Sequence, residues 1–361
     1  MDEELPDRAR KGRGAVSNAA SARFPQQDRA FVDDGWGSGE EAAHDPSNTV
    51  VGRDASRTAI TYNQSPDVPF DRSINPYKGC EHGCVYCFAR PTHAYLDLSP
   101  GLDFETKLFA KDALPELLRA ELAKPSYTPA TITLGANTDP YQPVERERRL
   151  TRACLEVLAE ANHPLCIVTK SALVARDADI LAPMAEKGLA RVMLSITTRD
   201  RELARRLEPR ATTPAKRFDA VRELREAGVP TGVLTAPMIP AITDHELEGL
   251  LASAAEAGAD RAGYVLLRLP HEIADLFGEW LDTHFPDRKA RVLNRVQAMR
   301  GGQLNDSQWG RRLRGEGEFA ELLEKRFQLA CTKHGLNRLR TELRTDRFTP
   351  PARDGRQMGL F

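Results

Sequence analysis

The sequence lacks the features of membrane, exported and disulfide-bonded proteins. No apolar run approaches the roughly 20 residues that a membrane-spanning helix needs. The first residues, Met-Asp-Glu-Glu-Leu-Pro, contain neither the basic nor the apolar region of a signal peptide. Six cysteines in 361 residues are too few for a disulfide framework. These absences predict a cytoplasmic protein, without a membrane partner, whose thiols stay reduced.

An excess of charge of either sign is also lacking, since the formal net charge is −1. What the chain does contain is three cysteines within eight residues, Cys80, Cys84 and Cys87, in a C-x3-C-x2-C spacing. Three thiolates can hold three corners of one metal cluster and leave a fourth open to a small molecule. A structural zinc ion normally takes four protein ligands, for which His82 or His93 would have to complete the site. The remaining cysteines are isolated and are expected to be small buried hydrophobes: Cys154, Cys166 and Cys331.

Tyr86 lies directly before the third cysteine, and the spacing together with this aromatic residue resembles the signature of the radical S-adenosylmethionine (SAM) superfamily. The resemblance implies that Cys80, Cys84 and Cys87 ligate a [4Fe-4S] cluster, and that SAM binds the open iron through its amino and carboxylate groups. It further implies that an electron from the cluster cleaves SAM to methionine and a 5′-deoxyadenosyl radical, which abstracts hydrogen from a substrate. Such chemistry needs a reducing partner of the flavodoxin or ferredoxin kind.

From about residue 73 the chain alternates short β-branched runs with longer amphipathic ones, which predicts parallel strands joined by helices. Six strands are expected, at Ser73–Tyr77, Ala130–Gly135, Leu165–Thr169, Arg191–Ile196, Thr231–Ala236 and Gly263–Arg268. Helices are expected at Asp112–Lys124, Arg146–Ala161, Asp177–Lys187, Pro214–Ala227 and Asp244–Ala257. The pattern leaves open whether this α/β sheet closes into a barrel or winds into an open sheet. The family resemblance implies a partial (β/α)6 TIM-like barrel, with the cysteine loop after the first strand.

This barrel is expected to occupy residues 67–270, between two flanking segments of different composition. Residues 1–66 are rich in charged and small residues without apolar periodicity and are predicted to be disordered or loosely ordered. Their basic run Lys11–Ala15 could instead dock on the core or contact a polyanion. Residues 271–361 are predicted to form a helical, basic extension, and from 285 onward they carry 17 Lys and Arg against 9 Asp and Glu. This surplus suits either a nucleic-acid contact or an ordinary solvated surface.

Loops that follow the strands of a (β/α) barrel form its active site, so polar residues there are candidates for ligand binding. By resemblance, the cofactor-binding residues are expected to be Tyr86, Gly135, Asn137, Ser195 and Glu208. Asn137 and Asp139 could equally serve turn formation and helix capping. Three basic residues, two after strands and Arg210 after a short helix, are candidates to pair with a carboxylate or a substrate phosphate, or to be plain rim residues: Lys170, Arg210 and Arg268.

Longer segments resemble one branch of this superfamily, the largely uncharacterised proteins related to spore photoproduct lyase and labelled DNA-repair-photolyase-like. These segments include Lys11 through Ala15, Ser65 through Asp67, Asn75 through Cys80, Phe88 through Tyr95, Ser99 through Glu105 and Arg300 through Gly302. The lyase resemblance implies a hydrogen-donating cysteine after the second strand, but here the residues are Ala136-Asn137-Thr138-Asp139. We therefore expect a radical SAM enzyme of unknown substrate, with nucleic acid as one candidate and with different hydrogen chemistry. The alternatives are a non-catalytic zinc protein and a simple iron–sulfur electron carrier.

Overall fold

The computed structural model describes residues 8–24, 48–338 and 342–351, which form a seven-stranded sheet and a three-stranded sheet. Six neighbouring strands of the larger sheet run parallel: β3 (Arg72–Ile74), β6 (Ile132–Leu134), β7 (Leu165–Thr169), β8 (Ala190–Ser195), β9 (Thr231–Met238) and β10 (Arg261–Leu266). β2 (Thr61–Tyr62) pairs antiparallel with β3. The strand order β10-β9-β8-β7-β6-β3-β2 leaves β10 and β2 unpaired with each other. The sheet is therefore an incomplete barrel, and the predicted partial (β/α)6 architecture is confirmed.

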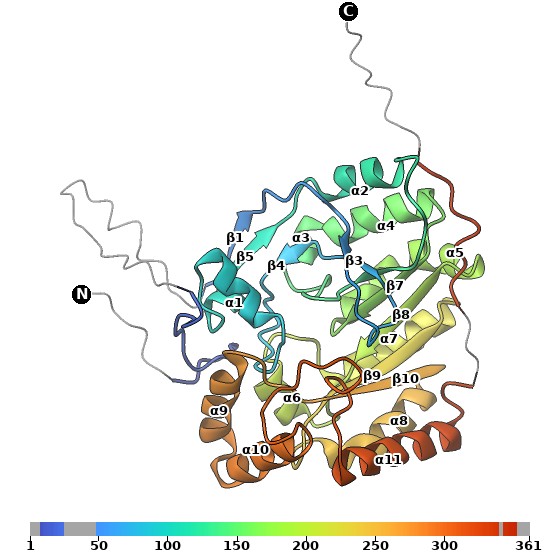
Figure 1. Ribbon diagram of the computed structural model, residues 1–361. Helices are drawn as coiled ribbons and strands as arrows, with labels where there is room; N and C mark the ends of the chain where they lie inside the picture. Colours follow the sequence, from blue (N-terminus) through green and yellow to red (C-terminus); the bar gives the residue numbers. More distant parts are fainter. Residues whose placement is uncertain (1–7, 25–47, 339–341, 352–361) are drawn as a thin grey trace, which may run out of the picture.

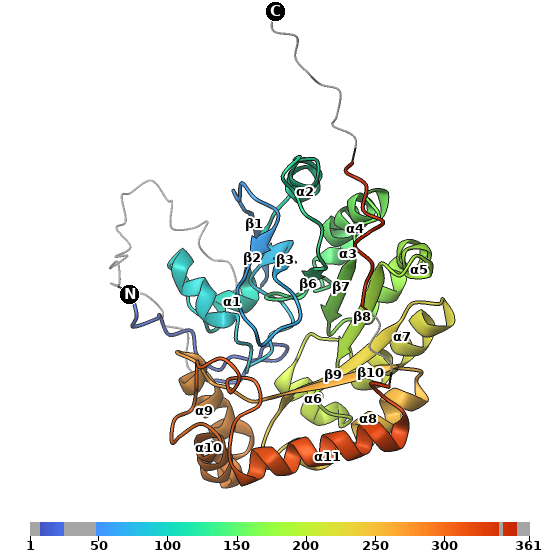
Figure 2. The same cartoon turned by 45° about the vertical axis from the view of Figure 1, so that its right-hand side comes forward.

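Helices cover the outer face of this sheet (Figure 1, Figure 2). They include all the predicted positions: α2 (Leu114–Leu122), α4 (Leu150–Glu160), α5 (Ala178–Glu186), α7 (Pro214–Glu226) and α8 (Leu247–Glu256). Short turns of 3-10 helix precede or connect them: η2 (Arg90–Leu96), η3 (Ala172–Asp177), η4 (Asp244–Glu246) and η5 (Pro286–Arg288). Strand residues such as Leu134, Ile167 and Val192 are completely buried in the cluster that these helices share. This apolar layer holds the strand ends, and hence the site, in place.

One predicted helix is divided in two. The pattern favoured a single helix over Arg146–Ala161, but α3 (Glu145–Arg148) ends at Arg149, which adopts a left-handed φ of 51°. The carboxylate of the buried Glu145 accepts hydrogen bonds from the backbone N–H groups of Thr151, at 3.0 Å, and Arg152, at 3.3 Å. These bonds satisfy the first turn of α4 and favour a new helix start over continuation.

A second, small sheet was not predicted. It consists of β1 (Val50–Arg53) parallel to β5 (Lys107–Ala110), with β4 (Tyr77–Lys78) antiparallel to β5. The first predicted strand was expected to continue to Tyr77 but leaves the large sheet after Ile74. Pro76 lacks an N–H group for the ladder, and its carbonyl accepts instead from the N–H of Lys111 at 3.0 Å.

Residues 8–24 lie against the core, between α1 (Asp103–Thr106) and the C-terminal helices (Figure 1). The backbone N–H groups of Gly14 and Ala15 donate to the carboxylate of Glu105 at 3.0 and 2.8 Å. The N–H of Asp103 donates to Asn18 at 2.9 Å. Residues 8–24 therefore dock on the core, as one interpretation of the basic run Lys11–Ala15 predicted. Residues 48–66 contribute the strands β1 and β2.

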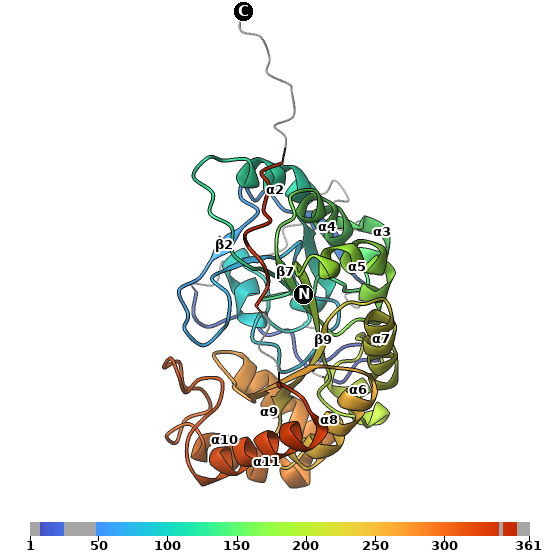
Figure 3. The same cartoon turned by 90° about the vertical axis from the view of Figure 1, so that its right-hand side faces the viewer.

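The C-terminal part is helical, as expected. It contains α9 (Ile273–His284), α10 (Lys289–Ala298) and α11 (Glu318–His334), and α11 packs along α8 at one edge of the barrel (Figure 3). The remaining helix, α6 (Arg201–Leu207), follows β8 and starts at Asp200, whose carboxylate accepts from the N–H groups of Glu202 and Leu203. No helix in the described ranges is both long enough and apolar enough to cross a membrane.

Candidate metal centre

The three predicted cluster ligands lie on one loop between β4 and η2. Backbone bonds fold this loop tightly: Gly83 donates to the carbonyl of Cys80 at 3.3 Å, and Cys87 donates to that of Cys84 at 3.2 Å. The loop is also anchored from outside, because Cys80 donates to Phe104 at 2.9 Å and Val85 donates to Leu207 at 3.1 Å. Cys80 and Cys84 are buried, and Cys87 is partly exposed. The sequence motif is therefore a rigid loop at the carboxyl ends of the strands.

The electrostatics of this loop fit a positively charged metal group. Burial raises the pKa of Cys80 well above its usual range, and the nearby Asp139, Cys84 and Cys87 raise it further. Burial also raises the pKa of Cys84 to about 12, although the charge of Lys170 opposes the shift. Three thiolates gathered in a buried site repel one another, and bound iron ions would offset that repulsion. Among the described residues, no three His, Cys, Asp or Glu side chains converge as ligands of a single metal ion; thiolates that hold separate irons of a cluster do not need to converge.

A completely buried ion pair between Arg90 and Glu105 supports the cysteine loop. Arg90 donates to the carbonyls of Cys84 at 2.8 Å and Gly83 at 3.1 Å, as well as to Glu105. Glu105 is the same carboxylate that accepts the backbone of residues 14 and 15. The pair thus joins the N-terminal segment, α1 and the cysteine loop in one hydrogen-bonded unit.

Tyr86 and Glu208 meet in a second buried network beside the thiols. The Tyr86 hydroxyl and Arg217 each donate a hydrogen bond to Glu208, and Thr197 donates to it at 2.8 Å. Burial raises the pKa of Glu208, but the charges of Arg217 and Lys170, with these hydrogen bonds, outweigh the effect and hold the pKa below its usual value. Glu208 is therefore an ionised carboxylate that fixes the orientation of Tyr86 between the second and third cysteines.

Ser195 belongs to the same network. It ends β8, its hydroxyl donates to the carbonyl of Ala236 at 3.1 Å, and its own carbonyl accepts from Arg217 at 2.8 Å. The structure therefore brings Tyr86, Ser195 and Glu208 together at one rim of the barrel. Arg217 connects Ser195 to Glu208, but it was not predicted from the sequence. Its position inside α7 gives no sign that its partner is Glu208, nine residues earlier.

Gly135 and Asn137 follow β6 at the next position along the rim. Gly135 has a φ of +85°, and a Cβ there would lie 2.1 Å from the carbonyl oxygen of Val168, so glycine is required. The backbone N–H of Asn137 donates to the side chain of Asn75 at 3.0 Å, while its own side chain is partly exposed. The turn is thus tied to the segment that leads into the cysteine loop.

Asp139 stabilises the turn after β6, which was one of the two roles that the sequence suggested for it. It also contacts the cysteine loop. Its carboxylate accepts from the N–H of Tyr141 at 2.9 Å and from that of Lys170 at 2.7 Å. The same carboxylate lies 3.3 Å from Nδ1 of His82. Burial raises the pKa of Asp139, but His82 and the hydrogen bonds lower it by more, so that the group is ionised. Of the two histidines considered as zinc ligands, His82 thus faces Asp139, and Nε2 of His93 lies 2.9 Å from the carbonyl of Lys107, while Nδ1 of His93 has no hydrogen-bond partner among the described residues.

The three basic candidates differ in their partners. Arg210 forms an ion pair with Glu81 of the cysteine loop, with 2.6 Å between Nη2 and Oε1, which is a supporting contact. The ammonium of Lys170 lies 5.8 Å from the Tyr86 ring centroid and makes no hydrogen bond or ion pair with the described residues. Burial lowers the pKa of Lys170, but the nearby acidic groups Cys84, Glu208 and Cys87 raise it by more. Arg268 lies over the ring of Phe88.

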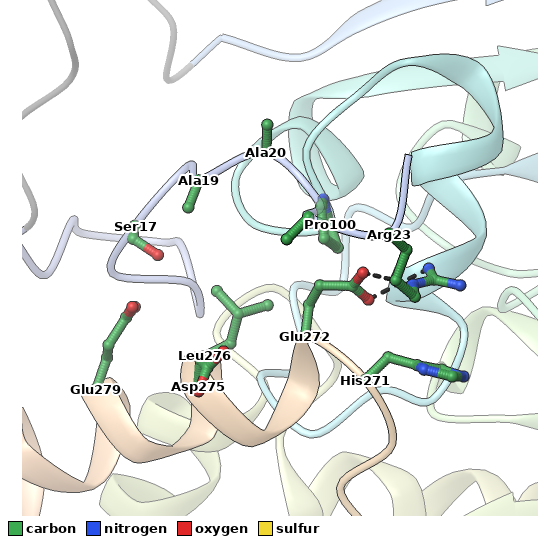
Figure 4. A pocket seen from close by; sticks show the side chains of 11 residues that line it. Ser17, Ala19, Ala20, Arg23, Pro100, His271, Glu272, Asp275, Leu276 and Glu279 are labelled. Atoms are coloured by element: carbon green, nitrogen blue, oxygen red, sulfur yellow. Dashed lines mark hydrogen bonds and ion pairs between the residues drawn. The ribbon is translucent and has the colours of Figure 1, made fainter. Parts of the chain in front are cut away.

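A separate pocket of about 270 Å³ lies between residues 17–23 and α9 (Figure 4). Its lining includes Ser17, Glu272 and Glu279, and Arg23 crosses its edge to pair with Glu272 at 2.6 Å. None of the cysteines or predicted cofactor residues lines it. We therefore assign the candidate site to the cysteine loop and its neighbours.

An incomplete (β/α)6 barrel with three thiols on the loop after its first strand is the architecture of one class of protein. The family model of the Radical SAM superfamily matches residues 74–254. The chain belongs to this superfamily.

Its curated relatives are themselves named as uncharacterised. A protein of Mycobacterium tuberculosis, Rv2578c, is 38% identical over 226 residues, which are 62% of this chain and 66% of that protein. A protein of Methanocaldococcus jannaschii, MJ0683, is 30% identical over 173 residues, 48% of this chain and 62% of that protein. The chain thus matches slightly less than two thirds of the length of these relatives.

Among solved structures, spore photoproduct lyase has a similar fold. Its complex with dinucleoside spore photoproduct superposes with a TM-score of 0.58 at 16% identity, covering 81% of each chain. A mutant of the same lyase with bound AdoMet and the dinucleoside gives 0.55 at 17% identity, again over 81% of each chain. At this identity the likeness establishes the shared fold alone.

Proposed function

We propose that this protein is a radical SAM enzyme that holds a [4Fe-4S] cluster on Cys80, Cys84 and Cys87 and reductively cleaves SAM. The observation that carries the proposal is the rigid loop of three thiols at the carboxyl ends of the strands, in a chain of this superfamily. When bound, the cluster and SAM supply a 5′-deoxyadenosyl radical that abstracts hydrogen. The chain itself binds, orients and shields these groups.

Lys170 is the residue that we assign to the SAM carboxylate. Its charge lies next to Cys84 and Cys87 and has no ionic partner among the described residues, so an incoming carboxylate would compensate it. Gly135 and Asn137 are proposed to contact SAM with their backbone and amide groups at the neighbouring turn. Ser195 and Glu208 contribute the adjoining polar wall, and Glu208 acts mainly by fixing Tyr86 and Arg217.

The electron donor is proposed to be a flavodoxin- or ferredoxin-like protein, because the cluster needs a strong reductant. All six cysteines are free thiols, which suits a reducing cytoplasm. For the substrate we propose a nucleic acid. The shared fold with a lyase solved in complex with a dinucleoside and the basic surplus after residue 285 support this choice. The turn after β6 has no cysteine, so the substrate radical would need another source of hydrogen.

The decisive test is anaerobic reconstitution with iron and sulfide, followed by dithionite and SAM, with 5′-deoxyadenosine measured by chromatography. We expect the nucleoside from the intact protein and from Cys331→Ala, which removes a buried thiol of α11, but not from Cys84→Ala. A colourless protein that holds one zinc ion would establish the zinc alternative. A stable cluster whose reduced EPR spectrum does not respond to SAM would establish the electron carrier.

A further inference from the structure

The guanidinium of Arg268 lies at the mouth of the barrel without an ionic partner. Arg268 follows β10 by two residues, and its Cζ lies 5.0 Å from the ring centroid of Phe88, the residue directly after Cys87. Within the described residues it forms no hydrogen bond and no salt bridge. Arg268 is partly buried: burial and the charge of Arg312 lower its pKa, and the nearby Cys87 and Asp67 offset only part of this effect. A partly buried cation without a direct ion-pair or hydrogen-bond partner can accept one from a bound anion.

Arg300 holds the strand end that carries Arg268. Arg300 is 3% exposed, and its guanidinium donates to the carbonyls of Leu267, at 2.8 Å, and Arg312, at 3.0 Å. These partners are neutral, so Arg300 places a second positive charge near Arg268, which the charge of Asp306 partly offsets. The segment Arg300-Gly301-Gly302, singled out in the sequence, thus has a structural role: it joins the end of β10 to the loop between α10 and α11.

Arg312, on the same loop, pairs with a carboxylate of the segment between β2 and β3. It donates to the side chains of Asp67 and Ser65, and the N–H of Gly310 donates to Asp67 at 2.6 Å. The segment Ser65-Pro66-Asp67, also singled out in the sequence, therefore anchors the loop. Arg312 thus has Asp67 as its ion-pair partner and Arg300 lies near the charge of Asp306, whereas Arg268 forms no ion pair with a described residue.

Apolar aromatic surface accompanies this charge. The side chain of Phe88 is 46% exposed, and Trp309, on the loop, is 60% exposed. The loop lies on the same side of the sheet as α9 and α10 (Figure 2). A guanidinium can donate two parallel hydrogen bonds to a phosphate, and aromatic side chains stack on nucleic-acid bases. The SAM carboxylate has the separate cation Lys170, which interacts with both Cys84 and Glu208, whereas Arg268 interacts with neither.

We propose that Arg268 binds a phosphate of the substrate, with Phe88 beside it in contact with the attached nucleotide, so that the site takes a single-stranded nucleotide unit next to Cys87. This inference rests on the proposed function, because it specifies which part of the substrate the barrel mouth recognises. Arg300 and Arg312 are positioning residues in this arrangement, since the protein's own groups occupy their donors.

The test is the binding of a fluorescent single-stranded oligothymidylate of eight nucleotides to the reconstituted protein, followed by anisotropy at several salt concentrations. We expect Arg268→Gln to weaken binding about 10- to 100-fold, as loss of a charged hydrogen-bond pair does. The slope of log affinity against log salt should fall by about 0.7, the value for one phosphate contact on a single strand. Arg314→Gln is the matched control, because it removes the same charge from an exposed residue of the same loop that pairs with Glu324.

Three outcomes would overturn the inference: no binding by the unaltered protein, equal affinity of Arg268→Gln and the unaltered protein, or equal losses in Arg268→Gln and Arg314→Gln. SAM affinity, measured in parallel by equilibrium dialysis, distinguishes the two anions. If Arg268→Gln loses SAM and keeps the oligonucleotide, Arg268 serves the cofactor and the phosphate subsite is refuted.

Formation of 5′-deoxyadenosine tests the proposed function separately: oligonucleotide binding through Arg268 without SAM cleavage would refute the enzyme and leave the subsite. Phe88→Ala should weaken oligonucleotide binding without changing its salt slope.

Discussion

At the scale of single residues, the site depends on a buried carboxylate that stays charged. Glu208 is 2% exposed, and its two oxygens accept hydrogen bonds from Tyr86, Thr197 and Arg217. An ionised group can remain in such a place only when its partners replace the water that it has lost. The guanidinium is the partner that carries charge, so the orientation of the tyrosine beside the thiols depends on a residue of α7.

Replacing Arg217 with methionine should therefore destabilise the protein by about 3–5 kcal/mol, the usual cost of leaving a buried charge without its partner. Arg222→Met on the same helix is the control, because its ion pair with Asp219 is exposed and should be worth less than about 1 kcal/mol. Urea unfolding of the cluster-free protein measures both. Equal losses in the two variants would mean that Glu208 does not carry a buried charge.

The candidate site was predictable from the sequence only where its signal is local. Cys80, Cys84 and Cys87 are found from their spacing, because ligands of one cluster on one loop must lie a few residues apart. Arg90, Arg217 and the approach of His82 to Asp139 were not found. Each of them depends on a partner brought near by the fold, and a lone arginine or histidine in a sequence has the same appearance whether it is buried or solvated.

At the scale of elements, the N-terminal segment is part of the site's support. Gly14 packs directly on the cysteine loop: a Cβ at this position would lie 1.8 Å from the carbonyl oxygen of Gly83. The next residue, Ala15, is 1% exposed and contacts Leu102 and Leu276. A segment whose composition predicts disorder is thus held by backbone hydrogen bonds to Glu105 rather than by an apolar face, which explains why periodicity did not reveal it.

Gly14→Ala should separate this segment from the cysteine loop, because backbone atoms cannot move aside as a flexible side chain does. We expect a loss of about 1–3 kcal/mol, as for other overpacked sites, and hydrogen exchange of the Ala15 amide about 10 to 100 times faster. Hydrogen exchange with mass spectrometry, together with the iron content after reconstitution, measures the effect. Gly278→Ala in α9 is the control, since its Cβ would meet only the end of Lys289 at 3.9 Å. Unchanged exchange at Ala15 would show that the segment does not rest on the loop.

The elements that were predicted are those that bury a continuous apolar run or a regular apolar face. The six parallel strands and the five outer helices were identified, because β-branched runs and amphipathic periods extend over several residues there. The strands β1, β4 and β5 were missed because each is short and partly exposed, whereas β3 and β6, with three residues each, are buried throughout. The break at Arg149 was missed because it depends on Glu145 as a cap within a helix-favouring sequence.

At the scale of the whole molecule, the C-terminal extension packs closely against the barrel and forms backbone hydrogen bonds with the end of its last strand. The N–H of Leu266, in β10, donates to Leu313 at 2.9 Å, and that of Leu269 donates to Leu304 at 3.1 Å. The indole of Trp280 in α9 donates to the carbonyl of Arg206 in α6 at 3.0 Å, within an apolar cluster that includes Cys84 and Tyr86. The composition changes near residue 270, where a boundary was expected, but residues on the two sides of this position pack against each other.

The ion pair between Asp67 and Arg312 is where this packing can be measured. It connects the turn after β2 to the loop that pairs with the end of β10, so it spans the two unpaired ends of the sheet. Both side chains are mostly buried, with 7% and 22% exposure. In a double-mutant cycle of Asp67→Asn and Arg312→Gln, we expect a coupling energy of about 1–3 kcal/mol in urea unfolding, as for hydrogen bonds between charged groups.

The surface pair Arg222 and Asp219, whose side chains are 52% and 46% exposed, gives the matched cycle, and its coupling should stay below about 1 kcal/mol because both groups are solvated. A larger coupling for the Asp67 pair would mean that the loop carries part of the stability that a closed barrel would obtain from strand pairing. Coupling no greater than that of the surface pair would mean that the first and last strands are held apart by their own helices, and that the loop rests on them without closing the gap. The result decides whether the loop between α10 and α11 is held rigidly beside Cys87 or can be displaced by a long substrate.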